Sequence, residues 1–89
     1  MLSIKTQSNN RYEVIINLKT KTSHVVTLSD KDYLNLTNKK VTKKELLKFS
    51  FKFLLEREPN TSILSSFELT VIAKYFPEYE KSVKNWCNL

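Results

Sequence analysis

Apolar and polar residues alternate through the first third of the chain, a pattern typical of half-buried β-strands. The alternation is clearest in residues 12–18 and, after the polar stretch 19–22, again in residues 24–28. Residues 2–6 alternate in the same way with fewer apolar side chains. We expect an antiparallel hairpin from the two clear runs, or a three-stranded meander with residues 2–6 as the additional strand.

The chain contains no glycine. Tight hairpin turns favour positive φ angles, which glycine adopts without steric cost and asparagine tolerates better than most other residues. In the first turn such angles would fall on Asn9 or Asn10. The composition therefore favours longer loops between the strands.

The middle of the chain predicts a long helix over residues 43–57. Thr42 and Glu45 have the spacing of a capping box, in which each side chain bonds to the backbone N–H of the other residue. Pro59 disfavours helical geometry in the residue before it, so the helix must end near Glu58.

Shorter helices are predicted on both sides of this long helix. Ser29 followed by Asp32 is a weaker capping signal, which predicts a short helix ending at residues 38–40. Further short helices are expected to begin at Thr61 or Ser62 (with Ile63 and Leu64 pointing inward), at Thr70 and at Pro77. We therefore expect one α+β domain over residues 1–89, with a β region in 1–29. The helical region in 30–89 contains the long central helix and two or three short helices.

The predicted central helix is apolar around most of its circumference. At about 100° per residue, its apolar side chains cover an arc of roughly 240° and leave only a narrow polar edge. A helix this apolar must be surrounded, and a chain of 89 residues has little else with which to cover it. We therefore expect a homodimer in which a second copy covers part of the helix, with a compact monomer as the alternative.

The net charge of +6 is concentrated at the front of the chain. Residues 1–55 hold eleven Lys and Arg against four acids, whereas residues 56–89 hold four against five. Basic segments bind nucleic acids and other acidic partners, although lysine-rich surfaces also serve solubility alone. The candidates for nucleic-acid contact are the lysines near the start of the central helix, Lys39, Lys40, Lys43 and Lys44.

The sequence also predicts where the protein resides. No apolar run approaches the length of about 20 residues that a membrane span needs, and the first ten residues lack the apolar core of a signal peptide. The single cysteine, Cys87, excludes an internal disulfide and suits a reducing compartment. We expect a cytoplasmic protein with no membrane partner.

The residue types on which most enzymes depend are scarce. One histidine and one cysteine cannot supply a catalytic triad or a metal site, and phosphate-binding loops require glycine. His24 lies among valines in a predicted strand, where we expect it to be structural. We predict no catalytic residue, no cofactor and no metal, and hence a protein that is not an enzyme.

Residues 50–64, which read SFKFLLEREPNTSIL, and residues 75–79, which read YFPEY, resemble the shared strings of a family of short, uncharacterised bacterial proteins. The resemblance covers about two thirds of the chain. Asn38 and Lys39 stand where those proteins tend to carry glycine. The resemblance implies a small bacterial protein and brings no known activity or ligand.

The succession of residues 24–28, 30–36 and 43–55 as strand, short helix and long helix resembles ribbon-helix-helix DNA-binding proteins. The closest stretch is residues 42–48. In that family two chains pair their strands and place the ribbon in the major groove. The resemblance implies nucleic-acid binding through the basic segment 39–52.

The function that we predict is that of a non-enzymatic interaction or regulatory module, dimeric, with an unknown protein partner. Nucleic-acid binding through residues 39–52 is the alternative. Aromatic residues are enriched at the centres of protein interfaces, although a stripe with helical spacing also suits a core. The interface candidates are Phe49, Phe53, Tyr75, Tyr79 and Trp86.

Overall fold

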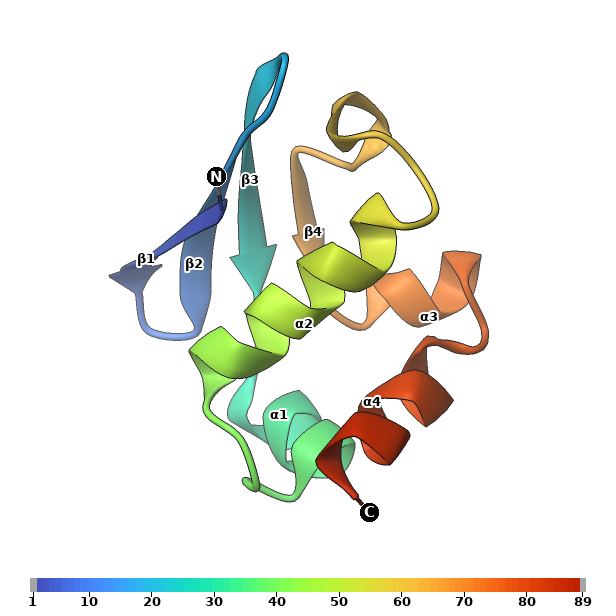
Figure 1. Ribbon diagram of the computed structural model, residues 1–89. Helices are drawn as coiled ribbons and strands as arrows, with labels where there is room; N and C mark the ends of the chain where they lie inside the picture. The colour runs from blue at the N-terminus through green and yellow to red at the C-terminus, as the bar shows by residue number, and fades with distance from the viewer. Residues whose placement is uncertain (1, 89) are drawn as a thin grey trace.

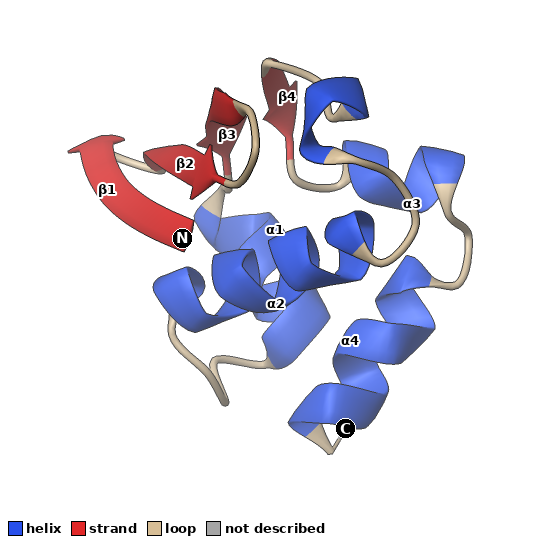
Figure 2. Ribbon diagram, turned by 45° about the horizontal axis from the view of Figure 1, so that its top comes forward, coloured by secondary structure: helices blue, strands red, loops and turns tan. Residues whose placement is uncertain are grey.

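The computed structural model describes residues 2–88. Strands β1 (Leu2–Ser8), β2 (Arg11–Asn17) and β3 (Lys21–Thr27) form the predicted antiparallel meander. A fourth strand, β4 (Ser66–Glu68), adds to β3 in parallel, so that the sheet order is β1-β2-β3-β4. The helices lie on one face of this mixed sheet (Figures 1 and 2). The chain is α+β, as predicted.

Two expectations about chain order are wrong. The region after residue 29 is not purely helical, because β4 follows the long helix and joins the sheet. No α-helix begins at Thr61 or Ser62, where the chain instead makes the 3₁₀-helix η1 (Asn60–Ser62) and then runs extended. Of the two side chains expected to point inward there, Ile63 is buried and Leu64 is exposed.

The turn between β1 and β2 is shorter than the absence of glycine suggested. It consists of Asn9 and Asn10 alone, and Asn10 takes the left-handed conformation with φ 64°. Asparagine tolerates this conformation better than most residues other than glycine. The expectation of a longer loop is therefore wrong at this turn.

The two capping signals in the middle of the chain operate as predicted. Helix α1 (Asp30–Thr37) begins where the Ser29 hydroxyl accepts a hydrogen bond from the Asp32 backbone N–H at 3.1 Å. Helix α2 (Lys43–Leu55) begins with both bonds of the capping box between Thr42 and Glu45. It ends two residues before the predicted boundary.

Helices α3 (Val71–Tyr75) and α4 (Tyr79–Cys87) complete the fold close to their predicted positions. Apolar side chains on the inner face of the sheet, such as Val14 and Val26, share one core with α2. Helix α4 packs against α1 and α2 (Figure 1). The chain thus buries the α2 side chains Leu46, Leu47 and Phe51 completely.

This coverage of α2 bears on the predicted homodimer. That prediction assumed that one chain could not cover the wide apolar arc of the helix, and the sheet and α4 together do cover it. A second copy is therefore not needed to bury α2. Within residues 2–88, no helix is long and apolar enough to span a membrane.

Candidate functional site

A hollow of about 160 Å³ opens between η1, β4, α3 and the C-terminal end of α2. We call it the groove, and its lining residues are Leu54, Glu58, Ser62, Ile63, Leu64, Phe67, Val71, Ile72, Tyr75 and Phe76. Leu64 and Tyr75 are 45% and 66% exposed, although both are large apolar or aromatic residues. Exposed apolar groups gathered at a hollow are typical of binding sites rather than of ordinary surface.

The groove carries a negative charge in a chain whose net charge is +6. Glu58 is the one charged residue among those that line it. The neighbouring cation, Arg57, is directed elsewhere, since its Nε donates to Glu78 at 3.1 Å and its guanidinium lies 3.5 Å from the centre of the Phe53 ring. The carboxylate of Glu58 is therefore free of this neighbour and available to a cationic ligand.

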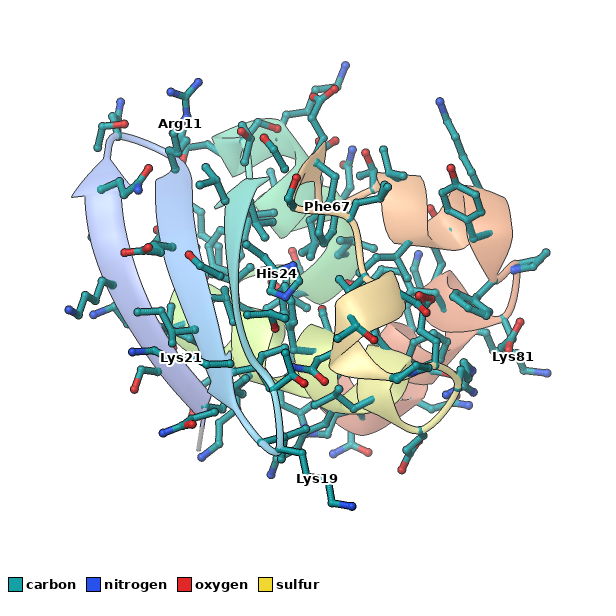
Figure 3. All side chains as sticks on the ribbon, turned by 90° about the horizontal axis from the view of Figure 1, so that it is seen from above. Arg11, Lys19, Lys21, His24, Phe67 and Lys81 are labelled. Atoms are coloured by element: carbon teal, nitrogen blue, oxygen red, sulfur yellow. The ribbon has the colours of Figure 1, made fainter. Side chains whose placement is uncertain are left out.

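One wall of the groove is held by hydrogen bonds to β3 and to the turn before it. Asn60 of η1 donates through Nδ2 to the Thr20 carbonyl at 2.8 Å and to the Thr22 hydroxyl at 2.9 Å. His24 of β3, only 2% exposed, bonds through Nδ1 to the Leu64 carbonyl at 2.7 Å and through Nε2 to the Thr22 hydroxyl at 2.9 Å. Figure 3 shows His24 between β3 and the segment that carries η1.

These partners determine the tautomer of His24. A carbonyl oxygen can only accept, so Nδ1 carries the proton and donates to Leu64. The Thr22 hydroxyl accepts from Asn60 and can donate its own hydrogen to Nε2. His24 is thus a buried structural residue, as the sequence indicated, and it fixes the segment that carries Leu64.

The four predicted nucleic-acid contacts differ in their exposure and in their hydrogen-bond partners. The Lys43 ammonium is bound by Asp30 at 2.5 Å and Asn10 at 2.7 Å. A hydrogen bond from Lys43 lowers the pKa of Asp30, so this ion pair is present at neutral pH. Lys43 therefore fastens α2 to α1, whereas Lys39, Lys40 and Lys44 are exposed.

The five interface candidates differ in their positions: some lie in the core, some join two helices and one lines the groove. Phe53 and Tyr79 are 5% and 0% exposed and belong to the core, so they stabilise the fold itself. Phe49 stacks on Trp86 with ring centres 4.4 Å apart and joins α2 to α4. Only Tyr75 of the five lines the groove.

A metal cluster and the thiol of Cys87 are two further places at which chemistry could occur. Residues 2–88 contain no cluster of three His, Cys, Asp or Glu side chains that could hold a metal ion. Cys87 is buried, and its burial raises the pKa of the thiol, which favours the unreactive protonated form.

Sequence reasoning missed most of the groove. Leu64 was expected to point inward, and the hydrogen bonds of Asn60 left no local pattern in the sequence. Comparison of the chain with protein-family models, curated proteins and solved structures finds no match. Both sequence resemblances remain predictions, and function has to be argued from the groove itself.

Proposed function

We propose that the protein is a non-enzymatic interaction module that holds a partner protein in the groove. The observation that supports this proposal is the exposure of Leu64 and Tyr75 at the rim of a hollow with apolar walls. Covering the exposed parts of these two side chains on binding is favourable in proportion to the apolar area removed from water. Two such residues in the lining of one hollow therefore favour the binding of a partner at this place.

The groove also has the rigidity that an interaction site benefits from. Its wall at residues 60–64 is bonded to β3 and to the turn before β3 through Asn60 and His24. A preformed site loses less conformational entropy when a partner binds than a mobile loop does. The proposed location is the cytoplasm, as the sequence predicts.

Site-specific photo-crosslinking tests this function. A photoreactive phenylalanine analogue is placed at Tyr75 and, as a control, at Ser23, which is exposed in β3 away from the groove. We expect the Tyr75 position to give one discrete crosslinked product in the native host and the Ser23 position to give none. Equal products from both positions, or none from either, would contradict the proposal. A product of twice the chain mass would identify a second copy as the partner, as the predicted homodimer requires.

Nucleic-acid binding is the second candidate, and a specific arrangement on α2 supports it. Lys44, Lys48 and Lys52 recur every four residues, so they lie along one side of the helix about 6 Å apart. All three are exposed, and within residues 2–88 none forms a salt bridge. Such a row can contact successive phosphates without reading sequence.

In the ribbon-helix-helix resemblance residues 24–28 would pair with a second chain, whereas β3 is paired here with β2 on one edge and with β4 on the other. Nucleic-acid binding is therefore argued from the row of Lys44, Lys48 and Lys52 alone.

An electrophoretic shift assay in salt from about 50 to about 200 mM tests nucleic-acid binding. Replacement of Lys44, Lys48 and Lys52 by Gln should abolish a shift that the matched replacement of Lys19, Lys21 and Lys31 leaves intact. Absence of any shift at low salt would rule the candidate out.

A further inference from the structure

Strand β4 has one free backbone edge. Val25 of β3 donates to the Ser65 carbonyl at 2.8 Å, and the Leu69 N–H donates to the Thr27 carbonyl at 2.9 Å. Successive residues of a strand direct their backbone groups to opposite sides, so those of Ser66 and Glu68 point away from β3. Within residues 2–88, no turn, loop or helix bonds to the backbone of either residue, and both are exposed.

The groove lies beside this free edge. Phe67 of β4 lines it on one side, and Val71, Ile72 and Tyr75 of α3 line it on another. A strand edge next to a helix is a common place for an extended peptide to bind, because the edge supplies backbone hydrogen bonds and the hollow receives alternate side chains. The geometry thus combines two requirements of peptide recognition.

The size of the groove limits what can enter it. Its volume of about 160 Å³ is close to that of cavities of about 150 Å³ that admit a benzene molecule. One aromatic or branched aliphatic side chain fills such a space. A folded helix with several apolar anchors would not fit.

Charge limits the occupant further. Glu58 is the charged residue that lines the groove. A cationic residue next to the apolar side chain would be attracted to its carboxylate, whereas an acidic segment would be repelled. The complementary occupant is therefore basic as well as apolar.

We propose that the groove binds an extended segment of a partner protein that pairs its backbone with Ser66 and Glu68. This segment inserts one large apolar side chain into the groove and places a Lys or Arg beside Glu58. The inference rests on the proposed function, since it names the occupant of the same site.

Selection from a phage-displayed library of random dodecapeptides on the full chain tests the inference. We expect enrichment of sequences with one large apolar residue next to Lys or Arg.

A fluorescent copy of the selected peptide is then titrated with each variant of the protein. Glu58→Gln should weaken binding by about threefold to tenfold, and Glu13→Gln, on the opposite face of the sheet, should leave it unchanged. Tyr75→Ala should weaken it by about tenfold or more.

The backbone pairing is tested separately, without altering the protein. Methylation of peptide nitrogens one at a time should weaken binding by about tenfold at alternate positions only, because each methyl removes one hydrogen bond. In parallel, the amide resonances of Ser66 and Glu68 should shift on titration with the unmodified peptide.

The outcomes separate this inference from the proposed function. Equal tolerance of methylation at every position, or a helical bound peptide, would overturn the strand pairing. A library without Tyr75-dependent binders, together with a discrete partner crosslinked at Tyr75, would overturn the extended peptide and leave the interaction module standing. If the library gives no Tyr75-dependent binder and crosslinking at Tyr75 gives no discrete partner, both the extended peptide and the interaction module would be overturned.

Discussion

The phenolic oxygen of Tyr79 lies 2.5 Å from the hydroxyl oxygen of Ser50, inside the core, and the bond between them joins α4 to α2. The Ser50 hydroxyl donates to the Leu46 carbonyl at 2.7 Å, so the phenol is the donor to Ser50. Both side chains are fully buried. The pair places a satisfied polar contact in the middle of an apolar core.

We expect Ser50→Ala to destabilise the protein more than Tyr79→Phe. The first change leaves a buried phenolic hydroxyl without an acceptor, at a cost of about 1–3 kcal/mol in the free energy of unfolding. The second removes the donor and leaves Ser50 bonded to Leu46, at a cost of about 0.5–1.5 kcal/mol. Urea unfolding of both variants measures the difference. The reverse order would show that another group accepts the phenolic hydrogen.

The same pair makes stability depend on pH in alkaline solution. Burial in the core raises the pKa of Tyr79 far above its ordinary value of 10.0. Above about pH 10 the unfolded chain loses this proton and the folded chain retains it, so the folded state is disfavoured as pH rises. The wild type should therefore lose stability relative to Tyr79→Phe between about pH 9 and about pH 11. Parallel pH profiles for the two proteins would contradict this.

The hydrogen bonds of Asn60 should contribute to the free energy of unfolding and should hold residues 61–65, the wall of the groove, in place. Asn60→Ala removes the donor to Thr20 and Thr22 and should lower the free energy of unfolding by about 1–3 kcal/mol. Asn60→Asp keeps the shape but sets an acceptor against the Thr20 carbonyl, so it should cost more. Urea unfolding and amide hydrogen exchange of residues 61–65 measure these effects. An Asp variant as stable as the wild type would refute the assignment of the donor.

Glycine at position 39 should stabilise the end of α1. Asn38 and Lys39 have φ 52° and 61°, a conformation that costs a non-glycine residue about 1–2 kcal/mol. After the greater entropy loss of glycine on folding, Lys39→Gly should gain about 0.5–1 kcal/mol. Lys40→Gly, next in the chain and without positive φ, is the control and should lower stability. Thermal unfolding compares the two variants, and equal changes would contradict the account.

Local signals in the sequence were enough to predict the meander and the starts of α1 and α2. Strand alternation and the capping box act over a few residues, so the sequence displays them directly.

Strand β4 and the groove could not be predicted in this way. Three residues are too few to show an alternating pattern, and β4 exists because β3 offers an edge to residues far along the chain. Likewise, Phe53 and Tyr75 looked equivalent as aromatic interface candidates. The packing of α4 buried the first, and the short α3 left the second exposed.

The parallel pairing of β3 with β4 also has a consequence for the order of folding. His24 and Leu64, which bond across this junction, are 40 residues apart, whereas the meander forms from neighbouring strands with short turns. Contacts between distant residues carry a larger loop-closure entropy and form late. We therefore expect the walls of the groove to form later in folding than the meander. A partner that recognises the groove would then bind only to molecules in which β3 and β4 have already paired.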